Sequence, residues 1–220
     1  MPAAADIHLV ALICSKLCHD LAGSIGAVSN GAELMAEETD PQMRDEAVRL
    51  IAQSANDAAR RLAFFRLALG ASGDLTDAMP GSELQRVAID YFAGGRVAFE
   101  PPALGAVPGD VSKPLGKALL LGLYGMAAAL PRGGKLRLIA EDGIWRILAE
   151  ATAPNATGPN AAAKLPEALR NGLDSAGPMP TEPNAALARH AHDLAVLAGF
   201  SARLSQSSDT TAELAFQRAL

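Results

Sequence analysis

The sequence is short of aromatic residues, cysteines and surplus positive charge, and each shortage excludes a class of protein. Phe, Tyr and Trp make up 4% of the 220 residues, and two cysteines are too few for a disulfide framework or a four-cysteine zinc site. The formal net charge of −5, without a stripe of lysine or arginine, argues against a nucleic-acid-binding protein. Half of the residues are hydrophobic, so the chain can bury a core and is not a disordered tail.

The sequence also lacks a secretory signal and a long uninterrupted apolar run. Residues 1–6 have neither the basic region nor the apolar region of a signal peptide. The longest apolar stretch, residues 118–130, includes two glycines and a tyrosine and is shorter than the roughly 18 residues of a membrane span. We therefore expect a cytoplasmic protein that binds no membrane and keeps its thiols reduced.

About the first seventy residues predict two long antiparallel helices. Apolar residues recur at steps of three, four and seven over residues 5–38 and again over residues 41–69. Asp40 and Pro41 suit the start of the second helix, and Gly70 suits its end. One hairpin leaves half of its apolar stripe exposed, so we expect a homodimer in which two hairpins form a four-helix bundle. The two cysteines, Cys14 and Cys18, are expected at the seam between the helices.

The rest of the chain predicts a second domain of mixed structure. Helices are expected over residues 80–92, 114–130, 165–170 and 184–198, and strands over residues 96–100, 135–140, 143–151, 201–204 and 212–216. Helices over an antiparallel sheet form an α/β sandwich, so the predicted fold class is α+β. The helical hairpin would occupy residues 1–72, and the sandwich residues 73–220.

His19 is the first candidate for chemistry. At about 100° per residue it lies opposite the apolar stripe, on a face with Lys16, Gly23, Gly26 and Asn30. Each interior glycine costs a helix roughly 1 kcal/mol relative to alanine, a penalty that folding alone does not explain. We interpret the two glycines as space for another protein to approach the imidazole.

The residues around His19 suit phosphoryl chemistry. A neutral imidazole is nucleophilic near pH 7 and can carry a phosphoryl group on nitrogen. Asp20 is a candidate to hold the ring tautomer or accept a proton; the alternative is an ordinary solvated acid. Antiparallel folding places Arg60 and Arg61 level with His19, where a guanidinium, like the ammonium of Lys16, would neutralise phosphate charge. The alternative is that these arginines pair with acids on the first helix.

Two segments resemble a known family. Residues 17–21, Leu-Cys-His-Asp-Leu, and residues 26–34, Gly-Ala-Val-Ser-Asn-Gly-Ala-Glu-Leu, resemble the phosphoacceptor helix of two-component signalling proteins, above all that of the ChpT-type histidine phosphotransferase family. Residues 61–70 resemble the end of that family's second helix, so the motifs span about residues 12–70. One departure is Ser24, where the family usually carries proline.

The resemblance implies a bacterial phosphorelay protein with a histidine-kinase-like body. His19 would accept a phosphoryl group from the aspartate of a receiver domain in a hybrid histidine kinase and pass it to response-regulator receivers. The second domain would resemble a degenerate histidine-kinase ATPase domain. Mg²⁺ is expected on the receiver partner, and neither a metal nor a cofactor on this chain.

Three elements of an ATP-binding domain of this lineage are missing from the sequence. Leu121 and Gly125 stand near the expected place of an asparagine on the central helix. Residues 151–155 contain no Asp-x-Gly turn, and residues 177–183 contain no Gly-x-Gly. We therefore expect a histidine phosphotransferase without autokinase activity. A divergent ATP-dependent histidine kinase and a non-catalytic dimeric scaffold that docks receivers remain as alternatives.

Overall fold

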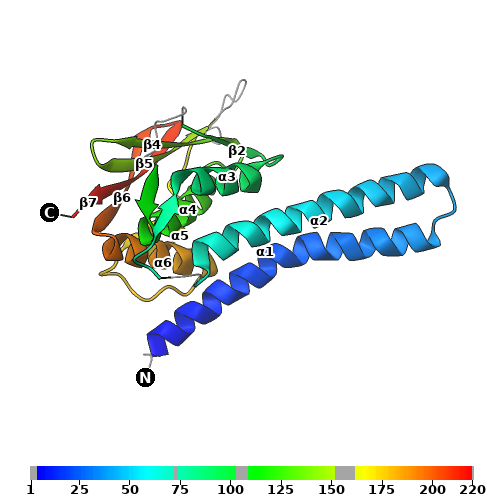
Figure 1. The fold of residues 1–220 in the computed structure, drawn as a ribbon, viewed down its shortest axis with the longest axis horizontal. Coiled ribbons are helices and arrows are strands. Elements are labelled where there is room, and N and C mark those ends of the chain that lie inside the picture. The colour runs from blue at the N-terminus through cyan, green and yellow to red at the C-terminus, as the bar shows by residue number, and fades with distance from the viewer. Residues whose placement is uncertain (1–3, 72–73, 103–108, 152–161, 220) are drawn as a thin grey trace.

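The fold consists of a long helical hairpin attached to a body of helices and strands, as Figure 1 shows for the computed structural model. The structure describes residues 4–71, 74–102, 109–151 and 162–219. The hairpin is formed by α1 (Ala4–Glu37) and α2 (Pro41–Leu69), so both predicted helices are confirmed. The boundary predicted at residues 72 and 73 lies outside the described residues.

Local capping explains where the second helix of the hairpin begins and ends. The Asp40 side chain accepts a hydrogen bond of 2.9 Å from the backbone N–H of Gln42, and Pro41 occupies the first turn. At the other end, the Gly70 N–H donates to the Arg66 carbonyl at 3.0 Å. The turn at residues 38–40, between the two helices, reverses the chain, so α2 runs back along α1.

The body contains a five-stranded sheet of mixed direction. Strand order is β2-β4-β5-β7-β6, in which β2 pairs in parallel with β4 and the other pairs are antiparallel. The predicted wholly antiparallel sheet is therefore wrong at β2, because the chain returns to β4 by a crossover through a helix. The strands are β2 (Val97–Glu100), β4 (Gly134–Glu141), β5 (Ile144–Ala151), β6 (Phe200–Ser208) and β7 (Thr211–Arg218).

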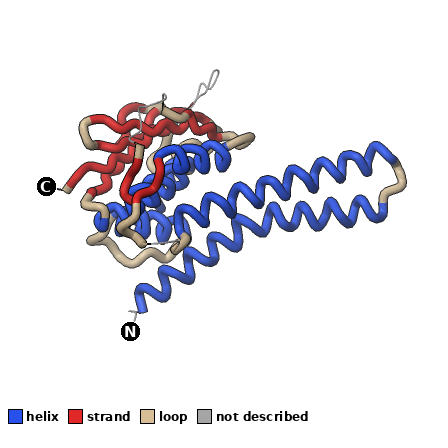
Figure 2. Tube along the Cα trace, in the orientation of Figure 1, coloured by secondary structure: helices blue, strands red, loops and turns tan. Residues whose placement is uncertain are grey.

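Four helices of the body lie between this sheet and the hairpin (Figure 2). They are α3 (Gly81–Phe92), α4 (Lys113–Ala127), α5 (Glu167–Leu173) and α6 (Pro183–Leu197), close to the predicted ranges. A second, two-stranded sheet joins β1 (Ala78–Pro80) to β3 (Asp110–Ser112). The sequence did not predict this pair, because three-residue strands are too short to show alternation.

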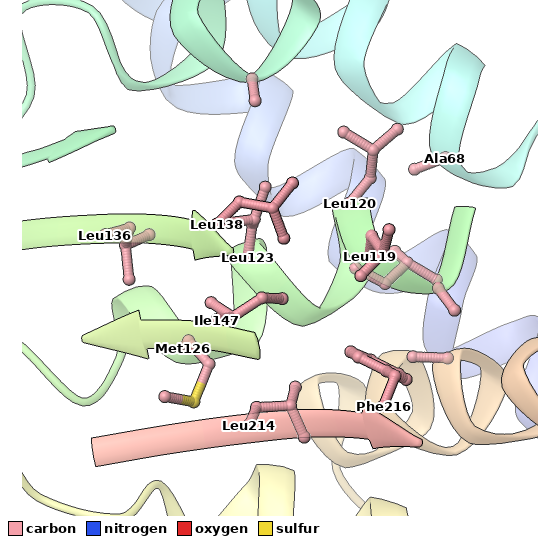
Figure 3. Close-up of a cluster of buried hydrophobic side chains, with 14 of the residues drawn as sticks. Ala68, Leu119, Leu120, Leu123, Met126, Leu136, Leu138, Ile147, Leu214 and Phe216 are labelled. Atoms are coloured by element: carbon pink, nitrogen blue, oxygen red, sulfur yellow. The ribbon is translucent and has the colours of Figure 1, made fainter. Parts of the chain in front are cut away.

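Helix α4 is the centre of the hydrophobic core. Leu119, Leu120, Leu123 and Met126 are fully buried. Figure 3 shows this helix between the sheet on one side and the end of α2, marked by Ala68, on the other. The base of the hairpin thus shares one core with the body, whereas its far end projects away from it (Figure 1).

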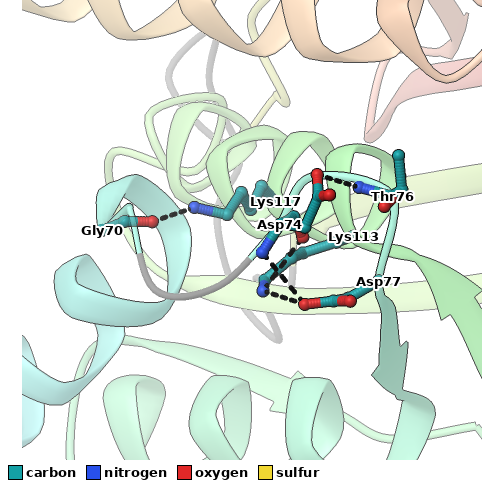
Figure 4. A network of polar contacts seen from close by, with 6 residues as sticks. All are labelled: Gly70, Asp74, Thr76, Asp77, Lys113 and Lys117. Atoms are coloured by element: carbon teal, nitrogen blue, oxygen red, sulfur yellow. Dashed lines mark hydrogen bonds and ion pairs between the residues drawn. The ribbon is translucent and has the colours of Figure 1, made fainter.

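A polar network fastens the end of α2 to α4 (Figure 4). The buried Lys117 side chain donates a hydrogen bond to the Gly70 carbonyl, which caps the exposed end of the α2 backbone. Lys113 contacts the Asp74 carbonyl at 3.3 Å and the Asp77 carboxylate at 3.4 Å. Burial lowers the pKa of Lys117. The network fixes the position of the hairpin base relative to the body.

Helix α1 is exposed and strongly apolar. Its most apolar 18-residue window has a mean hydropathy of 1.3 and none of that window is buried, so by length and composition alone the helix could cross a membrane. The longest apolar run in the sequence is residues 118–130, and the span-like character of α1 was not predicted, because Lys16 and Asp20 interrupt its apolar runs. An exposed apolar helix also fits a surface that a second chain covers.

Candidate functional site

His19 stands on an open side of α1, with its side chain 84% exposed. At about 100° per residue, the exposed apolar residues Val10 and Ile25 lie on the far side of the helix. The imidazole therefore faces solvent on a side that a partner covering the apolar face would leave free.

Asp20 is held beneath His19 by three contacts. Its side chain is only 8% exposed, so the alternative of a solvated acid is wrong. The Lys16 ammonium donates to Oδ1 at 2.5 Å, and the Tyr124 hydroxyl donates to Oδ2 at 2.8 Å. The Nδ1 atom of His19 lies 3.3 Å from Oδ1. The carboxylate thus links the phosphoacceptor candidate on α1 to α4 in the body.

These contacts keep Asp20 ionised. Burial raises the pKa of its carboxyl, but the hydrogen bonds from Lys16 and Tyr124 and the charge of Lys16 outweigh burial and hold the pKa below its usual value. An ionised carboxylate only accepts hydrogen bonds, so Nδ1 of His19 must be the donor. In the neutral ring this leaves the lone pair on Nε2, which is the nitrogen available for nucleophilic attack.

An aromatic cluster lies next to Asp20 and includes both tyrosines of the chain. The Tyr124 ring centroid lies 5.6 Å from that of Phe65 and 6.2 Å from that of Tyr91, and the rings of Tyr91 and Phe64 are 4.2 Å apart. Burial raises the pKa of Tyr91 to about 12 and raises that of Tyr124 further, with the Asp20 charge adding to the effect. The Tyr124 hydroxyl therefore stays protonated and remains a donor to Asp20.

Sequence reasoning missed both tyrosines. Tyr124 is 104 residues away from Asp20, so no spacing within a motif connects them. The one signal in the sequence is that a chain poor in aromatic residues places Phe64 and Phe65 near the end of α2, facing the body. The two phenylalanines predict a buried aromatic contact, but they do not show that a tyrosine hydroxyl in that contact binds Asp20.

Arg60 and Arg61 contact groups on α2 and α3. Arg60 forms an ion pair with Asp57 on its own helix, and the Arg61 guanidinium lies 6.0 Å from the Tyr91 ring centroid. Among the described residues, no hydrogen bond or ion pair joins either arginine to His19. Their proposed contact with a phosphoryl group stays a prediction, as does that of Lys16, whose ammonium already binds Asp20.

The glycines of α1 divide into two kinds. A Cβ atom added at Gly23 or Gly26 would meet nothing within 4 Å, whereas one added at Gly31 would lie 2.7 Å from the Ile51 side chain. Gly31 therefore allows the close approach of the two helices, and the other two are not required by packing. Asn30 is exposed, and α1 continues without interruption through Ser24.

Cys14 and Cys18 do not lie at the helical seam. Both are exposed. The side of α1 that packs against the rest of the chain carries Asp20 and Gly31, which lie roughly 100° or more around the helix from Cys14. The prediction failed because it treated the apolar stripe as a single seam, whereas part of the stripe is exposed.

A cavity of about 240 Å³ lies beside the site, between α4, α5 and α6. Leu121 and Gly125 line it, and a Cβ at Gly125 would lie 2.9 Å from the Leu169 side chain. The described lining residues include no charged side chain. The predicted absence of an Asp-x-Gly turn falls mostly on residues 152–155, outside the described residues. Within the described residues, no group of three or more His, Cys, Asp or Glu side chains could hold a metal ion.

Known proteins resemble this chain in sequence and in structure. Protein phosphotransferase ChpT of Brucella abortus (strain 2308) is 36% identical over 136 residues, which cover 61% of this chain and 62% of that protein. The chain thus matches less than two thirds of the length of this curated relative. A solved structure described as a bacterial phosphotransferase aligns with a TM-score of 0.77 and 27% identity, covering 99% of this chain and 98% of that one.

The body carries the family signature. Residues 81–210, more than half of the chain, match the model of the histidine phosphotransferase C-terminal domain, which confirms the resemblance seen in the α1 motifs. On the strength of this match, the chain belongs to the histidine phosphotransferase family.

Proposed function

We propose that this protein transfers phosphoryl groups between receiver domains in a bacterial phosphorelay, with His19 as the residue that is phosphorylated. The observation that carries the proposal is the exposed imidazole whose Nδ1 is held by the buried, ionised Asp20. The names of two similar proteins, both described as phosphotransferases, support the same activity.

The chemistry follows from the tautomer. The Nε2 lone pair attacks the phosphorus of a receiver's aspartyl phosphate, the P–O bond breaks, and the aspartate leaves as a carboxylate. The proton on Nδ1 stays in place, and Asp20 stabilises the positive charge that develops on the ring. In the second half, the carboxylate of another receiver attacks phosphorus, the P–N bond breaks and neutral His19 is restored. No ATP is consumed in either half.

The partners in this proposal are the receiver domains of a hybrid histidine kinase and of response regulators. The absence of bulk at Gly23 and Gly26 supports an approach along this face of α1. Asn30, Arg60 and Arg61 are proposed to contact the receiver or its phosphoryl group. We propose that the receiver brings the Mg²⁺ ion that neutralises the phosphoryl oxygens, and that this chain binds no cofactor.

The same proposal includes a homodimer in the cytoplasm. Large hydrophobic side chains are exposed along both helices of the hairpin, and a second hairpin that covered them would complete a four-helix bundle. This arrangement also accounts for the apolar character of α1 without a membrane. The exposed residues are Ile7, Val10, Ile25 and Leu34 on α1 and Met43, Val48, Leu50 and Leu62 on α2.

The kinase and scaffold alternatives are less favoured. Binding of ATP with Mg²⁺ requires groups that match a triphosphate, whereas the described lining of the cavity beside α4 is uncharged. A scaffold would have no use for an ionised acid held against an exposed imidazole, because such an arrangement costs burial of a charge.

Phosphotransfer assays separate the three functions. The protein is mixed with labelled ATP alone, and separately with a response-regulator receiver labelled on its aspartate. We expect label to move from the receiver to the wild type and to the control His8→Ala, which changes an exposed histidine on the same helix, but not to His19→Ala. Labelling by ATP alone would favour the kinase. If the wild type binds the labelled receiver but takes up no label from it, the scaffold is favoured.

A further inference from the structure

Asp20 is fixed from two helices at once. Lys16, one turn earlier on α1, binds Oδ1, and Tyr124 on α4 binds Oδ2. Because each oxygen has its own donor, the plane of the carboxylate is defined by groups on both sides. Oδ1 is then the oxygen that faces Nδ1 of His19.

Lys16 alone would not define this orientation. Its ammonium sits at the end of a flexible chain and has no fixed direction for its three donors. The Tyr124 hydroxyl, in contrast, is carried by a ring that packs against Phe64, Phe65 and Tyr91, so it offers a donor at a nearly fixed point. The rigid constraint on the carboxylate therefore comes from the body.

We infer that Tyr124 is a positioning residue for phosphotransfer, because its hydroxyl orients Asp20 so that the carboxylate holds the Nδ1–H of His19 and directs Nε2 outward. This inference rests on the proposed function and assigns to the body a part in the reaction that needs no nucleotide. Tyr124 acts through Asp20, to whose Oδ2 atom its hydroxyl donates.

The expected consequence is a loss of orientation when the hydroxyl is removed. In Tyr124→Phe the ring still fills its place in the aromatic cluster, but Oδ2 loses its donor and the carboxylate can follow Lys16 away from His19. Hydrogen bonds to charged groups are among the stronger ones in proteins, so we expect phosphotransfer to slow about tenfold. The matched control is Tyr91→Phe, which removes a hydroxyl from the same cluster without removing a donor to Asp20.

The pH dependence supplies a readout that a structural role would not change. The charged and titratable groups around Asp20 are Lys16 and His19 on α1, Tyr124 on α4, and, more distantly, Tyr91 on α3 and Arg61 on α2. Removing the Tyr124 hydroxyl takes away a donor that favours the ionised acid. The pKa of Asp20 should therefore rise, and the acid limb of the pH–rate profile should move to higher pH.

The experiment compares five proteins: wild type, Tyr124→Phe, the control Tyr91→Phe, Asp20→Asn, and the double variant of Tyr124→Phe with Asp20→Asn. The control is expected to transfer at close to the wild-type rate. Rates of transfer from a labelled receiver are measured against pH, and the Asp20 carboxyl is titrated by NMR in unphosphorylated protein. We expect Tyr124→Phe to slow the wild type about tenfold, to have no further effect in the Asp20→Asn background, and to raise the pKa of Asp20.

Each outcome has a distinct meaning. An equal slowing in both backgrounds, or an unchanged pKa of Asp20 in Tyr124→Phe, would overturn the role of Tyr124 while the proposed function stands. If the wild type accepts no label, the proposed function fails; the NMR titration still tests the contact between Tyr124 and Asp20, because it requires no activity. If Tyr124→Phe melts at a much lower temperature, the effect of Tyr124→Phe on the transfer rate is compared in the wild type and in Asp20→Asn. The difference between the two effects still measures the coupling between Tyr124 and Asp20.

Discussion

Helices α1 and α4 are both rich in apolar residues, yet they differ in what covers them. Eleven of the fifteen residues of α4 are buried, whereas Gly31 is the one buried residue of α1. The sheet and the end of α2 already cover α4, so its apolar side chains stabilise the fold of a single chain. On α1, Ile13 and Leu17 pack against the core, but the apolar side chains of Ile7, Val10 and Ile25 are exposed and contribute little to the fold of a single chain.

The comparison also explains where the candidate site lies. Asp20 on the exposed helix accepts a hydrogen bond from Tyr124 on the buried helix, so the site lies where the exposed helix meets the core. An open helix gives His19 access, and the core gives the carboxylate a fixed orientation. Neither region supplies both properties alone.

The largest expected effect is on stability, in the buried helix. Leu123→Ala would remove a fully buried side chain from between α4 and the sheet, and we expect the free energy of unfolding to fall by about 3 kcal/mol. Denaturant titration measures it. The comparison variant is Leu34→Ala on the exposed helix, for which we expect a smaller loss. If Leu34→Ala lowers the free energy of unfolding as much as Leu123→Ala does, at every protein concentration, the two helices do not differ as described.

Charge on the open face of α1 should break the dimer. Ile25 is 57% exposed in the single chain, and in the proposed bundle Ile25→Asp would place a carboxylate in an apolar interface. We expect the dimer dissociation constant to rise at least about 100-fold in sedimentation experiments, with little change in the fold of the monomer. Asn30→Asp, on the face of His19, should leave the dimer intact; a monomeric wild type at micromolar concentration would refute the bundle.

Bulk on the His19 face should affect transfer and not stability. Gly23→Leu and Gly26→Leu together raise helix propensity by roughly 1 kcal/mol per site and meet nothing within 4 Å of the new Cβ atoms. A receiver would be kept from bringing its aspartate to the imidazole, so we expect transfer to fall at least about tenfold while the dimer persists. Transfer at the wild-type rate would show that the glycines do not mark the docking surface.

The smallest expected effect is the acid dependence of stability. The folded-state pKa of Asp20 is held below its usual value, so its ionisation stabilises the fold above the unfolded pKa, near 4. That contribution is lost as the pH falls through the folded pKa. Asp20→Asn should flatten the decline in unfolding free energy over this acid range, as denaturant titrations at several pH values would reveal. If the unfolding free energy of Asp20→Asn falls with pH as steeply as that of the wild type, the contacts of Asp20 do not stabilise its ionised form.

Local signals made the hairpin predictable, since the periodicity of α1 and α2, the cap at Asp40 and the stop at Gly70 all act within a few residues. Contacts between distant segments were not predictable in the same way. The parallel pairing of β2 with β4 depends on a crossover, and the burial of Asp20 depends on Tyr124. The exposure of His19 follows from its helical face, whereas the donor that orients its neighbouring acid is visible only in three dimensions.

The proposed mechanism requires that Nε2 of His19 carries the phosphoryl group. The most direct test phosphorylates the protein, with its histidines labelled with ¹⁵N, from a receiver's aspartyl phosphate and records the phosphorus and nitrogen NMR spectra. We expect one phosphohistidine, with phosphorus bonded to Nε2 of His19 and the proton retained on Nδ1. A phosphoryl group on Nδ1 of His19, or on His8, His190 or His192, would contradict it.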